Sequence, residues 1–203
     1  MQSIWSLQGG VTLTPPLLTK LEAKTYYIDA DGLPSTTLGV EYTLQEPGWD
    51  SLGVGVGGPN GVNMRSGAVK VVASAACNGT QWIPVGDTAE DLSSALAEIE
   101  DFTVEDGPDT VSAFGYDGYH LVLVTTDVGF DGSNFTGCDD GYFDAYQGPT
   151  MAPWYFAPDQ FAEFWALDVE GTSLLIEANW YATTPAGDID KLRAVLDTIT
   201  IRP

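Results

Sequence analysis

Positive charge is what this sequence has least of. Its 203 residues include 7 Lys and Arg against 29 Asp and Glu, which gives a net charge of −22 at pH 7. The stretch from Val71 to Asp190 contains no Lys or Arg, although it holds 22 of the acidic residues. Nucleic acids and anionic membranes are bound through basic side chains that neutralise phosphate groups. The composition therefore excludes both as partners, whereas a protein with a basic surface remains compatible.

Long hydrophobic runs are also missing. No apolar run approaches the roughly 20 residues that a membrane-spanning helix needs. Residues 1–18 have no basic segment followed by an apolar one, so they do not form a signal peptide as they stand. We therefore expect either that an export signal has been removed or that the sequence has been trimmed at its N-terminus. With 44% hydrophobic and 11% aromatic residues, the chain is expected to form one domain over residues 23–203, preceded by an N-terminal arm at residues 1–22.

Cysteine is nearly absent, since the chain has only Cys77 and Cys138. Both lie beside turn-forming Gly, Asn or Asp residues, which suits a disulfide between two loops. Such a bond would close a loop of about 60 residues and contribute about 4 kcal/mol to stability. It would also indicate an oxidising compartment. The alternative is two unrelated buried thiols.

Short runs rich in β-branched and aromatic residues, separated by turn residues, fill most of the chain. We expect strands at residues 24–28, 39–44, 67–75, 109–114, 119–126, 141–146, 164–169, 173–181 and 198–201. One helix is expected to begin after Thr88, with Asp91 completing a capping box. The other has Thr184 as its expected N-cap and Pro185 at its first position. The pattern predicts an α+β fold, with an antiparallel sheet of about six to eight strands and two amphipathic helices.

Several short motifs occur in an order that points to a known family. They are Tyr27-Ile28-Asp29-Ala30-Asp31-Gly32, Pro47-Gly48-Trp49, residues 86–92, residues 116–120, Phe135-Thr136-Gly137-Cys138 and residues 164–172. Together they resemble an uncharacterised family of extracytoplasmic actinobacterial proteins and lipoprotein-like domains, over residues 23–203. The resemblance implies export and supports the disulfide, but no catalytic residue follows from it. The order of elements also resembles the PsbP/Mog1-type α/β/α sandwich.

Catalytic signatures are weak. The only histidine, His120, would need a serine such as Ser112, Ser133 or Ser173 and an acid beside it to form a hydrolase triad, and no Gly-x-Ser-x-Gly motif is present. We interpret His120 as an ordinary polar strand residue, and no catalytic residue is assigned. One histidine and two cysteines are too few for a zinc site.

The loop after residue 126 is rich in oxygen ligands. Its candidates for a calcium ion are Asp127, Asp131, Asn134, Asp139 and Asp140. Calcium takes six to eight oxygens from flexible loops of this kind, but the spacing does not match an EF-hand and no Glu closes the loop. The alternative is a solvated acidic loop, and no other cofactor is expected.

Three consecutive aromatic residues, Trp154, Tyr155 and Phe156, stand in a proline-bounded segment where burial is harder. They could form the rim of a ligand pocket or interface, or they could cover the core. With no catalytic signature, we expect a non-enzymatic extracytoplasmic binding domain for a small neutral or apolar ligand or for a basic protein partner. The alternatives are a hydrolase that uses carboxylates or a metal ion, and a structural or adhesion module of the cell surface.

Overall fold

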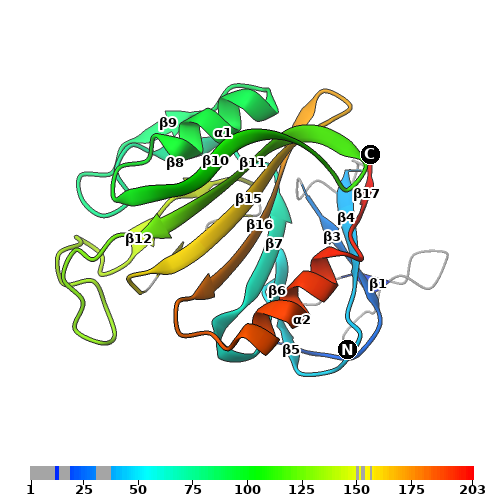
Figure 1. Ribbon diagram of the computed structural model, residues 1–203. Helices are drawn as coiled ribbons and strands as arrows, with labels where there is room; N and C mark the ends of the chain where they lie inside the picture. The colour runs from blue at the N-terminus through cyan, green and yellow to red at the C-terminus, as the bar shows by residue number, and fades with distance from the viewer. Residues whose placement is uncertain (1–11, 14–18, 31–37, 150, 152–153, 156) are drawn as a thin grey trace, which may run out of the picture.

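A large antiparallel sheet forms the centre of the molecule (Figure 1). The computed structural model describes residues 12–13, 19–30, 38–149, 151, 154–155 and 157–203. The sheet has eight strands in the order β10-β11-β15-β16-β7-β6-β5-β2. Their bounds are β2 (Lys20–Leu21), β5 (Trp49–Ser51), β6 (Gly55–Gly57), β7 (Asn63–Gly67), β10 (Phe102–Ala113), β11 (Tyr116–Thr125), β15 (Gln160–Val169) and β16 (Thr172–Tyr181).

Smaller sheets and two helices pack around this sheet, so the predicted α+β class and strand number are confirmed. In Figure 1, helix α1 (Ala89–Ala97) lies on one side of the main sheet, and α2 (Ala186–Leu196) lies on the other, towards a second sheet. That sheet has the order β1-β3-β4-β17, with β1 (Thr12–Leu13), β3 (Thr25–Asp29), β4 (Gly39–Thr43) and β17 (Thr200–Arg202). The remaining elements are β8 (Val71–Ala73), β9 (Trp82–Pro84) and β13 (Tyr146–Gln147) in a three-stranded sheet, β12 (Phe143–Asp144) and β14 (Trp154–Tyr155) in a two-stranded one, and the 3-10 helix η1 (Pro59–Gly61).

The main sheet separates two hydrophobic cores because successive strand residues point to opposite faces. On β16, Leu174 and Ile176 belong to the core that includes α2 and the second sheet, whereas Leu175 belongs to the core that includes α1. We call these the α2 face and the α1 face of the main sheet. Because β16 carries apolar residues on both faces, both faces of the main sheet have to be covered. The core that includes α1 covers one face, and the core that includes α2 and the second sheet covers the other.

The structure confirms the predicted N-terminal cap of one helix and contradicts that of the other. The capping box of α1 is confirmed, since the Thr88 side chain accepts from the Asp91 N–H and Asp91 Oδ2 accepts from the Thr88 N–H. The predicted cap of α2 is wrong, because Pro185 is the N-cap residue. The Thr184 hydroxyl instead donates to the Asn60 carbonyl at 2.9 Å and accepts from the Tyr181 N–H at 3.1 Å. It therefore ties η1 to the end of β16.

Several element boundaries differ from the prediction. The strand expected at 67–75 is split into β7 and β8, which belong to different sheets, and the strand expected at 141–146 is two short ones. Within the predicted arm, β1 pairs with β3 and β2 pairs with β5. The Leu21 side chain is buried in the α2-face core. Among the described residues, neither helix is long and apolar enough to cross a membrane.

The disulfide between Cys77 and Cys138 is present, as predicted, with a Cα–Cα distance of 4.7 Å. It joins the turn after β8 to the acidic loop at residues 127–140. The Asn78 side chain donates to the Gly137 carbonyl at 2.7 Å, and the Asp139 N–H donates to the Cys77 carbonyl at 3.3 Å. The acidic loop is therefore fixed to the α1 side of the molecule.

Candidate functional site

The α2 face of the main sheet is only partly covered. Leu121 and Leu123 belong to the α1-face core, so the residues between and beside them on β11 point to the α2 face. Helix α2 packs against β4 and β7 rather than β11. As a result His120, Val122 and Val124 are half-buried. This region therefore offers apolar and polar side chains that a ligand can reach.

A buried carboxylate organises the polar side chains here. Glu163, on β15, has a side chain that is 9% exposed. His120 Nε2 lies 2.9 Å from Glu163 Oε1, and the guanidinium of Arg193 on α2 forms an ion pair with Glu163 Oε2. The His120 and Arg193 side chains are 22% and 41% exposed. One buried acid thus orients an imidazole and a guanidinium that both remain accessible.

Aromatic rings surround these polar groups. Phe161 and Trp180 are cross-strand partners whose rings stack at 5.6 Å with an interplanar angle of 6°. The Arg193 guanidinium lies over the Trp180 ring at 5.2 Å, and the Trp165 ring lies 5.4 Å from that of His120. Cation–π and stacking contacts of this kind hold side chains in fixed orientations. We name His120, Glu163, Arg193, Phe161 and Trp180 the open-face cluster.

The imidazole of His120 uses one ring nitrogen for Glu163 and keeps the other for a further partner. His120 Nδ1 is 4.0 Å from Asp106 Oδ2, which is too long for a hydrogen bond, so this nitrogen can bind a ligand. Ser112 and Ser173 lie on the α1 face, opposite to His120, as the strand register requires. These two serines therefore do not lie on the same face of the sheet as His120.

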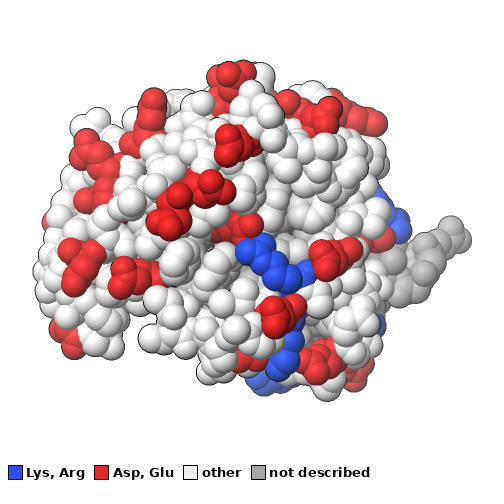
Figure 2. Space-filling view, viewed as in Figure 1, with Lys and Arg blue, Asp and Glu red and all other residues white. Residues whose placement is uncertain are grey.

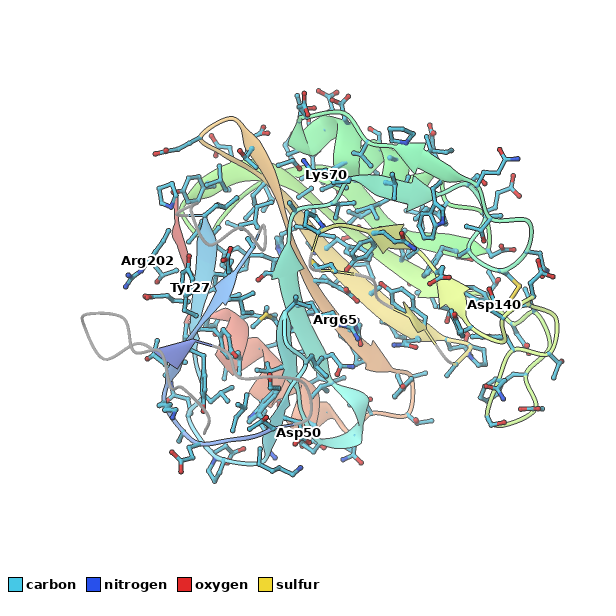
Figure 3. The ribbon with its side chains drawn as sticks, turned by 180° about the vertical axis from the view of Figure 1, so that it is seen from behind. Tyr27, Asp50, Arg65, Lys70, Asp140 and Arg202 are labelled. Atoms are coloured by element: carbon cyan, nitrogen blue, oxygen red, sulfur yellow. A yellow bond between two sulfur atoms is a disulfide. The ribbon has the colours of Figure 1, made fainter. Side chains whose placement is uncertain are left out.

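A second polar group lies inside the α1-face core. Glu177, on β16, is 0% exposed. Its carboxylate accepts hydrogen bonds from the Tyr146 hydroxyl, from the Tyr155 hydroxyl at 3.0 Å and from Asn179 Nδ2 at 2.5 Å. Arg65 Nη1, on the neighbouring β7, lies 3.4 Å from Glu177 Oε1. We call these five residues the Glu177 cluster, and Figure 3 labels Arg65 on its strand.

Burial perturbs the titration of this second cluster. The pKa values of Tyr146 and Tyr155 are raised well above the ordinary value, first because the hydroxyls are buried and next because the Glu177 charge disfavours a phenolate. The pKa of Arg65 is raised, because the attraction of Glu177 and the tyrosine oxygens outweighs desolvation, which is the largest single effect and acts in the opposite direction. The charged form of Arg65 is thereby favoured.

The predicted aromatic rim has only one side chain that is described. Tyr155 is fully buried and bonds to Glu177, so it points into the molecule. Trp154 lies on β14, and nothing is described of its side chain, while Phe156 lies outside the described residues. Their role in ligand binding stays a prediction.

Three of the predicted calcium ligands accept hydrogen bonds from backbone N–H groups. Asp131 Oδ1 accepts from the N–H groups of Ser133 and Asn134 at 2.8 and 2.9 Å, and these bonds lower the Asp131 pKa. Asp127 Oδ1 accepts from the Gly129 N–H at 3.0 Å, and Asp139 Oδ2 from the Gly79 N–H at 3.3 Å. Within the described part of the chain, no three His, Cys, Asp or Glu side chains are grouped to hold a metal ion. Calcium binding by Asp127, Asp131, Asn134, Asp139 and Asp140 stays a prediction.

Sequence reasoning missed both buried acids and their arginines. A signal was present, because Glu163 and Glu177 each interrupt an apolar strand, in Phe161-Ala162-Glu163-Phe164-Trp165 and Leu174-Leu175-Ile176-Glu177-Ala178. A lone acid in such a run is costly to bury unless it is paired. The sequence could thus indicate that partners exist, but their identity depends on strand order and helix position.

Comparisons with known proteins do not assign the chain to a family. No family model matches the chain, and no curated protein matches its sequence. Among solved structures, LpqN of Mycobacterium tuberculosis, described as involved in cell envelope biogenesis, is similar with a TM-score of 0.35 and 10% identity over 91% of this chain and 90% of that chain. A likeness at this level transfers neither function nor site residues to this chain.

Proposed function

We propose that the protein is an extracytoplasmic binding domain that takes a small, neutral, largely apolar ligand at the open-face cluster. The observation that carries the proposal is a buried Glu163 that holds His120 and Arg193 in place beside half-exposed apolar side chains. Ligand sites combine an apolar lining with a few fixed polar groups in this way. The disulfide supports a location outside the cytoplasm.

The form of the ligand follows from the side chains that face it. Val122, Val124 and Phe161 supply apolar contact, and His120 Nδ1 supplies one hydrogen-bonding atom. Arg193 is already paired with Glu163, which lowers its attraction for an anion. A ligand with an apolar ring and one hydroxyl group fits these features better than a charged one.

Tryptophan fluorescence and NMR titration with phenol, indole and cyclohexanol test the proposal. Binding should perturb the emission, because Trp165 and Trp180 lie in or beside the cluster. Phe161→Ala and His120→Ala should each weaken binding at least severalfold. Phe130→Ala is the matched control, because Phe130 is an exposed aromatic residue in the acidic loop. Equal losses in Phe130→Ala and Phe161→Ala, or saturable binding by none of the three probes, would reject the site.

A basic protein partner is the second candidate, and the charge distribution favours it. Figure 2 shows acidic residues spread over the upper and left parts of the molecule, whereas basic residues gather towards the lower right. Six of the seven basic residues are in ion pairs with acids: Lys20, Lys24, Arg65, Lys191, Arg193 and Arg202. The region from Val71 to Asp190 has no cation of its own. Its negative field would steer a cationic partner towards it.

Ionic strength distinguishes this second candidate from the first. Binding of an oligo-arginine peptide should weaken steeply as salt rises, because exposed charges are screened over about 8 Å at physiological salt. Binding of a neutral ring compound at the open-face cluster should barely depend on salt. A neutral peptide of the same length serves as control, and equal affinity for both peptides contradicts the electrostatic candidate.

A further inference from the structure

Glu177 does not depend on Arg65 for its hydrogen bonds. Three neutral donors, from Tyr146, Tyr155 and Asn179, already reach its two oxygens, and the bond from Asn179 is as short as 2.5 Å. Arg65 approaches the same carboxylate at 3.4 Å, which is long for a charge-assisted bond. The pair is therefore held mainly by charge, and the guanidinium fork is not engaged in the two-bond geometry that it favours.

Most N–H donors of Arg65 have no hydrogen-bond partner in the described part of the chain. A guanidinium carries five N–H donors, and Glu177 is the one hydrogen-bond partner of Arg65 among the described residues. The partner of Arg65 on the other flanking strand is Gly55, which has no side chain to compete for the guanidinium. No Arg65 nitrogen is among the described polar atoms that are both buried and unpaired. With a side chain that is 17% exposed, Arg65 thus directs its remaining donors to solvent.

We propose that the outward N–H groups of Arg65 form a binding site for a carboxylate group. The ligand would meet the guanidinium from the solvent side while Glu177 and its tyrosine and amide donors hold it from within. This site lies on the α1 face of the sheet and is separate from the open-face cluster, so it does not rest on the neutral ligand proposed there.

The choice of a carboxylate follows from shape and charge. The planar guanidinium matches the two oxygens of a carboxylate, and partial burial strengthens such a bond relative to water. A dianion such as phosphate would meet twice the repulsion from a protein of net charge −22. Because that repulsion is long-ranged and screened by salt, carboxylate binding here should be maintained or strengthened as salt rises, unlike an ordinary surface ion pair.

NMR gives a direct measurement on the intact protein, because the chain has only three arginines, Arg65, Arg193 and Arg202. Their side-chain Nε–H signals are assigned with single Arg→Lys variants. Sodium acetate is titrated against sodium chloride at equal ionic strength. The Arg65 signal should shift saturably with acetate alone, whereas Arg202, which is paired with Glu41 at the surface, is the internal control. An Arg65 signal that responds equally to both salts overturns the proposal.

Two variants sharpen the test with a second readout, the rise in Tm that acetate causes relative to chloride. Arg65→Lys should abolish that rise, because an ammonium cannot make the two-bond contact. Glu177→Gln should tighten acetate binding severalfold, because it removes the competing charge. A purely structural Arg65 predicts no acetate response in either variant, and that result rejects the site. If Arg65→Lys does not fold, the wild-type titration and Glu177→Gln still decide.

The source of the carboxylate is resolved with peptides. An N-acetylated dipeptide with a free C-terminus and the same dipeptide as its C-terminal amide are compared with acetate. If the free acid binds more tightly than acetate and the amide does not bind, the ligand is a peptide terminus. If acetate binds and neither peptide does, the site takes small free carboxylates only. Failure of all three to bind contradicts the proposal and leaves the open-face cluster untouched.

Discussion

Two buried glutamates of the main sheet are each paired with an arginine, but they sit in different surroundings. Glu177 is 0% exposed and receives hydrogen bonds from Tyr146, Tyr155 and Asn179. Glu163 is 9% exposed, and its partners His120 and Arg193 reach solvent. The difference lies in the other partners, because the two tyrosine hydroxyls that bind Glu177 are buried, whereas the His120 ring that binds Glu163 stays accessible. We expect the stability lost on removing each acid to depend on whether the side chains that it leaves unpaired can reach water.

Glu177→Ala should have the largest effect, because it leaves two buried tyrosine hydroxyls without their acceptor and removes the charge that holds Arg65 from the core side. We expect a loss of about 3–5 kcal/mol in the free energy of unfolding, as for one side of a buried ion pair. Urea unfolding followed by far-UV circular dichroism measures it. A loss smaller than that of Glu163→Ala would show that Glu177 is not the more structural of the two.

Alkaline pH should act on the Glu177 cluster next. The folded-state pKa values of Tyr146 and Tyr155 are raised above the unfolded value, so their stabilisation is complete below the unfolded pKa of about 10 and is lost as pH rises through the folded values. Each tyrosine contributes a slope of up to about 1.4 kcal/mol per pH unit in that window. Chemical unfolding between neutral and strongly alkaline pH measures the slope. Tyr155→Phe should reduce it, because the variant has one buried hydroxyl fewer to titrate.

Glu163→Ala should cost less, about 1–2 kcal/mol, because the side chains that it leaves behind can be solvated. Arg193 is 41% exposed and keeps its contact with the Trp180 ring. The same variant should weaken binding at the open-face cluster, since His120 loses the carboxylate that orients it. Unfolding and ligand titration on one preparation check both effects. Unchanged ligand binding would place the site elsewhere.

Removing an exposed ion pair should have the smallest effect on the free energy of unfolding. Lys20 Nζ lies 2.7 Å from Asp50 Oδ2, and the lysine side chain is 78% exposed. Lys20→Ala should change the free energy of unfolding by less than about 1 kcal/mol, and high salt should remove that difference. Thermal unfolding at low and high salt checks it. A larger loss would indicate that β2 depends on this pair for its place at the sheet edge.

The sequence predicted features that depend on local chemistry. The capping box of α1 follows from Thr88 and Asp91 three residues apart, and the strand pair of β15 and β16 follows from two apolar runs around Glu170-Gly171. The disulfide was predicted because both cysteines stand in loops. The cap of α2 was wrong because the Thr184 hydroxyl has partners on η1 and β16, and a distant contact outweighed a local preference.

The sequence by itself determined the charge imbalance and the presence of lone acids in apolar strands. It also determined the consecutive apolar residues that give β16 an apolar side chain on each face. Only the tertiary structure decided which groups meet those acids. The order β11-β15 brings His120 to Glu163, and the order β16-β7 brings Arg65 to Glu177. Each pair joins residues that are at least 40 positions apart in the chain. Local propensity extends over a few residues, so the burial and pairing of these charges had to be set by the packing of the whole sheet.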